Sequence, residues 1–314
     1  MDASTAPVRS GGLLEAQLTA RRFVLTAEIT PPDAATADAV IARAGVLKGA
    51  VDAVNVTDGA GARAHMSAFA AAAVLARQGV EPVLQFTVRD RNRLALQGDL
   101  IGMSAMGIPN LLCLHGDDVK AGDQPETKMV YDIDSRALMT LARQMRDDGT
   151  LPSGRAIDPA PRLLIGAADA PQEPKPDFAP KGIEAKIAAG ADFFQTQFVF
   201  DAGMARRYFG RLHDLGITER AHFIVGVGPL LSARQARWMN ENLFGVVVPE
   251  ATIARLEKAA DQKAEGRAIA VELVQAFAAI PGIAGAHLMA PQQKADAIAE
   301  VAAQAAVRGR PRAT

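Results

Sequence analysis

The fold is decided around the stretch FVLTAEITPP, residues 23–32. It is a short run of strand-forming residues that carries one carboxylate, Glu28, between Ala27 and Ile29, and it stops at two prolines. A carboxylate on an otherwise apolar strand is unusual, because burying its charge costs several kcal/mol unless the group is paired or neutral. We therefore expect the fold to hold Glu28 against the ends of other strands.

The same kind of run recurs along the chain, and each run is followed by a segment with helical spacing of apolar residues. The strand-like runs are FVLTAEIT (23–30), AVNVT (53–57), PVLQFTV (82–88), NLLCLHG (110–116), RLLIGAA (162–168), FFQTQFVF (193–200), HFIVGVG (222–228) and GAHLMA (285–290). The helical segments are 35–47, 62–78, 91–106, 135–146, 183–189, 203–215, 233–240, a longer 253–279, and 294–306. About eight strand–helix units predict an α/β protein, a (β/α)8 TIM barrel formed as a single domain by residues 12–306.

An open doubly wound sheet is the alternative, but its dinucleotide fingerprint is weak in this chain. Gly59 and Gly61 have the spacing of the first two glycines, whereas Ala64 stands where the third belongs. The end segments, residues 1–11 and 307–314, show no apolar period, and we expect both to be disordered.

The composition excludes several classes of function. The 314 residues carry a net charge of −1 and show no basic stripe, so no nucleic-acid partner is predicted. No apolar run approaches the roughly 20 residues that span a bilayer, and the N-terminus lacks the order of a secretory signal, so we expect a soluble, cytoplasmic protein without a membrane partner. Cys113 is expected to be a buried hydrophobe, and the histidines lack metal-ligand spacing, so no metal site is predicted.

Polar side chains stand where most strands end, and a barrel would bring them to one mouth. They are Glu28, Thr57, Asp58, Gln85, Thr87, Arg89, Asp90, His115, Asp117, Asp169, Gln195, Gln197 and His287. Because Gln195 and Gln197 share one face of a strand, we expect one of them to contact a polar ligand. The sequence lacks the catalytic motifs of the common hydrolases, so the residues alone predict a barrel enzyme with a polar, carboxylate-containing mouth.

Other interpretations of these residues stay open at this point. The segment 89–91 also suits a solvated turn, and 132–135 suits a helix N-cap. Backbone carbonyls can satisfy both His115 and His287 without any functional role.

Taken together, the strand ends resemble the methylenetetrahydrofolate reductase family. The matching pieces are AEITPP (27–32), VNVTDGA (54–60), QFTVRDRN (85–92), CLHGDD (113–118), VYDIDS (130–135), KIAAGADFFQTQFVFD (186–201) and GVGPLLSARQARWMNENLFGVVVPE (226–250). The resemblance covers residues 22–306 in the right order. Three of the pieces, RDRN, YDIDS and GVVVPE, look most like a bacterial branch that includes acetogen reductases and reductases fused to methyltransferases.

The resemblance implies a TIM barrel that reduces 5,10-methylenetetrahydrofolate to 5-methyltetrahydrofolate. In the family, NAD(P)H passes a hydride to a bound flavin, usually FAD, and leaves. Folate then takes the place of the nicotinamide, which makes the cycle ping-pong. The methylene bridge opens only when the departing nitrogen receives a proton, and Glu28 falls on the family's general acid. Asp117 falls on the second catalytic carboxylate, near the flavin ring and the pterin.

The resemblance also assigns binding residues. Thr57 matches a flavin-side threonine, Lys186 matches a lysine near the cofactor phosphates, and Gln197 and Gln235 match glutamines that contact folate. The further cofactor-binding positions are Asp58, Gln85, Thr87, His115, Gly116, Asp132 and Ser135, and the further substrate-binding positions are Met239 and His287.

Several departures from the family pattern bear on the cofactor. Asp58 stands where many members have Tyr, Gln85 where they have His, and Ala185 where they have Arg, while Met239 replaces an aromatic residue. FAD, FMN and direct transfer from NADH without flavin therefore all remain open. No 2′-phosphate pocket is recognisable, so NADH and NADPH are both retained as co-substrates.

Two competing functions are also kept. A folate-dependent methyltransferase barrel would transfer a methyl group without oxidising pyridine nucleotide. A non-catalytic or electron-relay subunit of a C1 complex would need a cysteine-rich partner, because the lone cysteine cannot build an iron–sulfur centre. A homo-oligomer is compatible with the Ala-rich outer helices, and the physiological direction, methionine synthesis or C1 catabolism, is not determined by the sequence.

Overall fold

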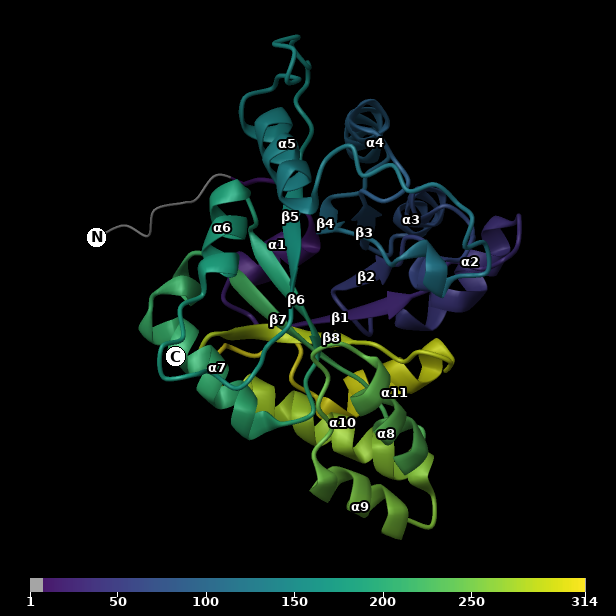
Figure 1. The fold of residues 1–314 in the computed structure, drawn as a ribbon, viewed down its shortest axis with the longest axis vertical. Helices are drawn as coiled ribbons and strands as arrows, with labels where there is room; N and C mark the ends of the chain where they lie inside the picture. The colour runs from purple at the N-terminus through teal and green to yellow at the C-terminus, as the bar shows by residue number, and fades with distance from the viewer. Residues whose placement is uncertain (1–7, 314) are drawn as a thin grey trace.

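Residues 8–313 are described by the structure, a computed structural model of the chain. Parallel strands close into an eight-stranded barrel in chain order, with β8 pairing with β1 (Figure 1). The strands are β1 (Val24–Ile29), β2 (Ala53–Val56), β3 (Pro82–Thr87), β4 (Asn110–Leu114), β5 (Leu164–Asp169), β6 (Phe193–Phe198), β7 (His222–Val227) and β8 (Ile283–Leu288). Each strand overlaps a predicted run, and the single-domain TIM barrel is confirmed.

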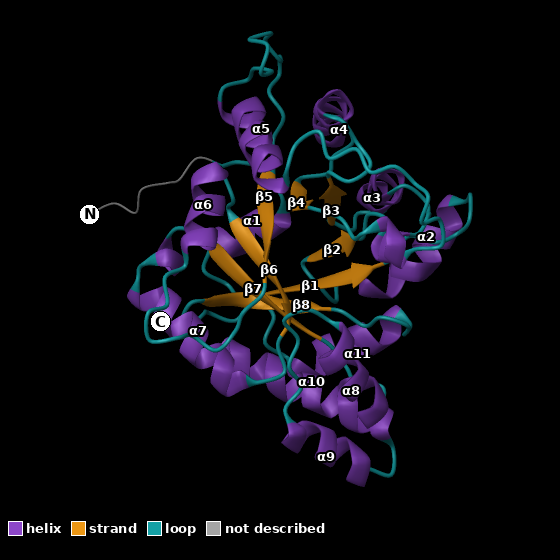
Figure 2. Cartoon of the chain, viewed as in Figure 1, coloured by secondary structure: helices purple, strands orange, loops and turns teal. Residues whose placement is uncertain are grey.

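Helices surround the barrel and cover its outer face (Figure 2). They are α1 (Leu13–Thr19), α2 (Ala37–Ala44), α3 (Ala68–Arg77), α4 (Arg93–Ala105), α5 (Ser135–Asp147), α6 (Lys181–Ala189), α7 (Ala202–Asp214), α8 (Ala233–Asn242), α9 (Glu250–Lys258), α10 (Gln262–Ala278) and α11 (Ala295–Ala305). Short 3-10 helices are η1 (Gly45–Leu47), η2 (Ala60–Ala62), η3 (Val119–Ala121) and η4 (Ile217–Glu219).

Two helix predictions need correction. The long segment 253–279 forms two helices, because the Asp261 side chain accepts hydrogen bonds from the backbone N–H groups of Lys263 and Ala264 and caps a new helix there. The segment 62–78 begins as a loop, since Gly59 and Gly61 both have positive φ, and α3 starts only at Ala68.

An additional helix, α1, closes the N-terminal end of the barrel. Its Leu14 and Leu18 join a buried cluster that includes one inward-facing residue from each strand. The strand residues of this cluster are Val24, Ala53, Val83, Leu112, Leu164, Phe193, Ile224 and Ala284. Apolar side chains thus fill the lower barrel, and the polar residues are left to the upper layers.

The ends of the described chain are tied down by hydrogen bonds. Near the start, the backbone N–H groups of Arg9, Ser10 and Gly11 donate to the Glu15 carboxylate. At the other end, residues 308–313 differ from the expected disordered tail, because Arg22 pairs with Pro311 in an antiparallel bridge and Phe23 N donates to the Arg310 carbonyl. Residues 1–7 and 314 lie outside the described residues.

The hydrophobic core of the barrel wall includes the lone cysteine of the chain. Cys113 is buried in β4, as expected, and burial raises the pKa of its thiol. Over residues 8–313 no helix is long and apolar enough to cross a membrane.

Candidate active site

Glu28 lies at the C-terminal end of β1, on the wall of a cavity of about 400 Å³ in the barrel mouth. Gln85 of β3 donates from Nε2 to Glu28 Oε2 at 2.7 Å. His287 of β8 places its Nε2 3.7 Å from the same oxygen, and the Glu28 side chain remains 26% exposed. The structure therefore brings together three residues that the sequence placed at strand ends.

A buried polar layer lies beneath this cluster. Asn55 and Gln195 exchange two amide hydrogen bonds, of 2.6 and 3.0 Å. Gln195 Nε2 also donates to Thr26 Oγ1 at 3.0 Å, and Thr26 Oγ1 lies 2.9 Å from His287 Nδ1. These side chains come from four different strands and are 0 to 3% exposed, so the layer is fully enclosed within the barrel.

A second carboxylate lies across the mouth from Glu28, because β5 is opposite β1 in the closed strand order. This residue, Asp169, accepts a hydrogen bond from Tyr208 Oη at 2.9 Å. Burial raises the pKa of Asp169, against the Tyr208 hydroxyl and the Lys186 ammonium, which favour the charged form. Lys186 donates to the Ala168 carbonyl at 2.7 Å, and burial lowers its pKa. The mouth thus has a carboxylate on two opposite walls and an amine beside one of them.

The residues predicted to hold a cofactor separate into several groups. Gln85 and Lys186 line the mouth cavity, but Asp58 and Thr87 bind each other: Asp58 Oδ2 accepts from the backbone N and the Oγ1 of Thr87, both at 2.9 Å. Arg91 completes this cluster by donating to both Asp58 oxygens, at 2.6 and 3.2 Å. Asp58 is therefore occupied by an ion pair inside the protein.

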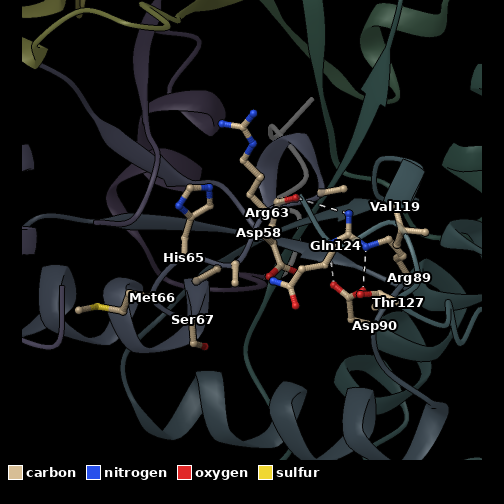
Figure 3. A pocket seen from close by; sticks show the side chains of 14 residues that line it. Asp58, Arg63, His65, Met66, Ser67, Arg89, Asp90, Val119, Gln124 and Thr127 are labelled. Atoms are coloured by element: carbon tan, nitrogen blue, oxygen red, sulfur yellow. Dashed lines mark hydrogen bonds and ion pairs between the residues drawn. The ribbon is translucent and has the colours of Figure 1, made fainter. Parts of the chain in front are cut away.

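The loops after β2, β3 and β4 enclose a separate cavity of about 280 Å³ (Figure 3). In Figure 3, Arg63, His65 and Ser67 of the β2 loop lie opposite Gln124 and Thr127 of the β4 loop. The two loops touch closely at Gly122, where the Ala62 carbonyl leaves no room for a Cβ.

Arg89 lies beneath these two loops. It donates to the Asp90 carboxylate at 2.8 and 2.7 Å and to the Asp117 carbonyl at 3.0 Å. A solvated turn at 89–91, one interpretation of the sequence, is wrong for Arg89, which is 4% exposed.

Other predicted cofactor residues lie outside both cavities. Asp117 accepts a hydrogen bond from Gly61 N at 2.7 Å, and its neighbour Gly116 has φ of 98°, where a Cβ would clash with Arg89 and Thr87. The exposed His115 ring stacks on Tyr131 at a centroid distance of 4.3 Å.

Two further predicted cofactor residues lie just before α5 and at its first position. Asp132 accepts hydrogen bonds from the Arg93 side chain, and that guanidinium lowers the pKa of Asp132 to about 2. Ser135 is the first residue of α5, and Asp134 caps this helix, as one interpretation of the segment 132–135 proposed.

Of the predicted substrate residues, Gln197 and His287 line the mouth cavity and the other two do not. Gln235 accepts a hydrogen bond from Leu231 N at 2.7 Å and takes part in the cap that Ser232 makes at the start of α8. Met239 packs into the hydrophobic core and is 3% exposed.

Thr26, Asn55 and Phe244 belong to the mouth or to the layer beneath it, and the sequence analysis did not select them. Phe244 follows α8 and lines the mouth cavity, although it is 83% exposed. Thr26 precedes Glu28 by two positions, so the period of a strand already placed its side chain on the inner face. For Phe244, an aromatic residue in a loop after a helix, the sequence offered no comparable signal.

Comparison with known proteins identifies the family. The model of the methylenetetrahydrofolate reductase family matches residues 13–306. This chain belongs to that family. No curated protein matches it in sequence.

Solved structures support the fold. An uncharacterized protein from Clostridium thermocellum, which binds two copies of 5-methyl-5,6,7,8-tetrahydrofolic acid, is 14% identical, with 92% of this chain and 98% of that chain covered and a TM-score of 0.58. At this identity the likeness concerns the fold alone. Tryptophan synthase from M. tuberculosis is similar at a TM-score of 0.42 (17% identity, covering 85% and 97%), and oxaloacetate acetylhydrolase with oxalate at 0.47 (10% identity, covering 90% and 81%). Both scores are too low to carry an argument.

Proposed function

We propose that this reductase-family barrel converts 5,10-methylenetetrahydrofolate to 5-methyltetrahydrofolate with NAD(P)H as the source of hydride. The observation that carries the proposal is Glu28, a carboxyl at the barrel mouth that receives the Gln85 amide and faces the His287 ring. Family membership supplies the reaction class.

Glu28 would act as the proton donor. Opening the methylene bridge to an iminium places electrons on a folate nitrogen, and a carboxylic acid in hydrogen-bond reach can protonate it as the bond breaks. Gln197, on the same wall of the mouth as Gln195, would orient the pterin, and Asp169 across the cavity supplies an acceptor for pterin N–H groups. The hydride then adds to the iminium carbon, so that charge and atoms balance.

The flavin that the family resemblance implies fits this structure poorly. Of the predicted cofactor residues, Asp58, Asp117 and Asp132 already accept hydrogen bonds from protein groups. The two cavities that contain predicted cofactor residues are separated, one in the mouth and one among the loops. One observation favours a ligand on this side: Thr57 Oγ1 is buried without a hydrogen-bond partner among the described residues. We assign no step to a flavin.

The experiment that tests the proposal is the substitution Glu28→Gln, which removes the acidic proton and preserves the shape of the side chain. We expect methylenetetrahydrofolate reduction with NADH or NADPH to fall about 100- to 10,000-fold, the range of a positioned general acid, with unchanged thermal stability. Glu241→Gln, an exposed position on α8, is the matched control and should retain full activity. Unchanged folate turnover in Glu28→Gln would overturn the assignment.

The same preparation decides the role of flavin. A colourless protein with intersecting, sequential kinetics would show that the nicotinamide gives its hydride directly to folate. A yellow protein with ping-pong kinetics would restore FAD or FMN, and mass spectrometry of the released cofactor separates those two. Methyl transfer without oxidation of pyridine nucleotide would instead favour a methyltransferase.

A further inference from the structure

In the buried layer beneath Glu28, the donor and acceptor of each hydrogen bond determine the donor and acceptor of the next. Asn55 Nδ2 donates to Gln195 Oε1, and Gln195 Nε2 donates back to Asn55 Oδ1. This reciprocal pair orients both amides. The second hydrogen of Gln195 Nε2 is then directed to Thr26 Oγ1, at 3.0 Å.

The Thr26 hydroxyl connects Gln195 to His287. Its hydroxyl oxygen already accepts from Gln195, and the one hydroxyl proton has the ring nitrogen Nδ1 of His287 within 2.9 Å. A hydroxyl that donates to Nδ1 requires that nitrogen to be unprotonated. The neutral imidazole must then carry its hydrogen on Nε2.

The Nε2–H group of His287 lies near the carboxyl of Glu28, at a distance too long for a direct hydrogen bond. It lies 3.7 Å from Oε2, the same oxygen that accepts the Gln85 amide at 2.7 Å. A protonated carboxyl has one carbonyl oxygen that accepts and one hydroxyl oxygen that carries the proton. The Gln85 N–H at 2.7 Å makes Oε2 the accepting oxygen, and the nearby positive end of the His287 Nε2–H bond favours the same choice, which leaves the proton on Oε1.

We propose that the buried Asn55–Gln195–Thr26 network is a positioning device that holds His287 as the Nε2–H tautomer and thereby places the acidic proton of Glu28 on Oε1. This inference rests on the proposed role of Glu28 as general acid. His287 and Thr26 act here as positioning residues, through Glu28. The family resemblance gave His287 a substrate-binding role. The hydrogen bond to Thr26 and the proximity to Glu28 account for the position of this ring, which is 3% exposed, without that role.

The test uses Thr26→Val, which removes the hydroxyl but keeps a β-branched side chain of nearly the same shape. Gln195 retains its bond to Asn55, so the amide pair survives. Thr26→Val leaves the Gln195 Nε2 amide, 3.4 Å away, as the remaining donor to Nδ1. Because that contact is longer than the one it replaces, the Nδ1–H tautomer of His287 should gain population and draw the Glu28 proton to Oε2. We expect kcat to fall about three- to tenfold with KM little changed, and Thr26→Ser to restore it.

The tautomer itself is measured by ¹H–¹⁵N NMR of the histidine rings in the wild-type protein, without substrate. The expected result is Nε2–H for His287 in the wild type and a mixture in Thr26→Val. Thr218→Val is the matched control, because it breaks an equivalent threonine contact with His213 Nδ1, of 3.0 Å, on η4. It should leave both kcat and the His287 signal unchanged.

Two results would overturn the inference. One is an Nδ1–H tautomer of His287 in the wild type, which would mean that both amides have the reverse orientation. The other is a folded Thr26→Val with wild-type tautomer and wild-type kcat. If Thr26→Val does not fold, the wild-type tautomer still decides. Because the NMR measurement needs no turnover, it stands even where the reductase assay fails.

Discussion

The β1 and β8 side of the barrel mouth differs from the side formed by the loops after β2, β3 and β4. On the first side, Glu28 keeps a partly exposed carboxyl that lines a cavity, and the residues beneath it serve to orient it. On the second side, the charged residues neutralise one another, as Asp58 does with Arg91. Both sides carry polar strand ends, but the Asp58 carboxylate is bound by Arg91 and Thr87, whereas the Glu28 carboxyl receives no cation hydrogen bond from the described residues.

This contrast indicates that a polar side chain at a strand end is a candidate catalytic residue only when it lines a cavity and is not already bound by a charged protein group. Asp58 and Glu28 are both carboxylates at strand ends, and the sequence places both at the predicted mouth. Their neighbours decide the outcome: Glu28 faces the Gln85 amide and the His287 ring, whereas Asp58 faces a guanidinium. The first arrangement suits a proton donor, and the second suits structural support.

The largest effect on stability is expected from Asp58→Ala. The Asp58 side chain is 8% exposed, and its removal leaves the Thr87 backbone N–H without its acceptor and the Arg91 guanidinium with only the longer contacts to Asp99 and to the Thr87 carbonyl, at 3.4 and 3.3 Å. Removing one partner of a buried pair typically costs about 3 to 5 kcal/mol, and we expect a loss near the lower figure because Arg91 stays partly exposed. The measurement is the free energy of unfolding in urea.

Asp132→Ala is the control for this comparison, since Asp132 is also a predicted cofactor residue with an arginine partner, Arg93, but on the surface. Its loss should be much smaller, as exposed pairs contribute little. If Asp58→Ala kept wild-type stability and instead lost a bound flavin, the loop side would be a cofactor site after all.

The sequence predicted the strands well and the site only in part. The strands were recognisable because apolar runs buried on both faces need no knowledge of neighbours. The same runs also identified Glu28 as exceptional. By contrast, the pairing of Asp58 with Arg91 joins residues 33 positions apart, and no local pattern states which charges will meet.

The errors have similar physical causes. Met239 is buried because it lies on the face of α8 that packs on the core, together with Ala233 and Ala236. The break between α9 and α10 contains two alanines, which favour a continuous helix, so only the capping side chain of Asp261 marks it. Residues 308–313 are held by hydrogen bonds to residues near 22, a contact across the whole chain.

A smaller effect is expected at the second mouth carboxylate, through Tyr208→Phe. The Tyr208 hydroxyl donates to Asp169 at 2.9 Å, and a hydrogen bond to a charged group contributes about 1.5 to 3 kcal/mol. Burial raises the folded-state pKa of Asp169 above its unfolded value, so this group costs stability at neutral pH and the cost disappears as pH falls below the unfolded pKa. Tyr208→Phe should raise that pKa further.

The destabilisation by Tyr208→Phe should therefore be greatest near pH 7 and shrink as the pH falls through the raised pKa of Asp169, because the lost hydrogen bond then no longer serves a charged carboxylate. Urea unfolding of the two proteins at a series of pH values measures the difference. A difference that stays constant with pH would show that the hydroxyl contributes only packing, and that Asp169 is not the charged second wall of the mouth.

The smallest effect is expected at Phe244, the exposed aromatic residue at the edge of the mouth. An exposed side chain loses little stability on truncation, but its ring lines the cavity that we propose for folate. Stacking of an aromatic ring on a heterocycle is worth about 1 kcal/mol at its lower end, so Phe244→Ala should raise the KM for methylenetetrahydrofolate about fivefold. The kcat should remain unchanged, because an apolar ring takes no part in the proton transfer assigned to Glu28.

Trp238→Ala is the matched control for Phe244. Trp238 lies on α8, is 52% exposed and does not line the mouth cavity, so its removal should leave both KM and kcat as they are. An equal rise in KM from both substitutions would mean that the apolar surface of α8 and its following loop binds the substrate as a whole. A change in kcat alone would mean that Phe244 acts on the proton transfer by Glu28 and not on substrate binding.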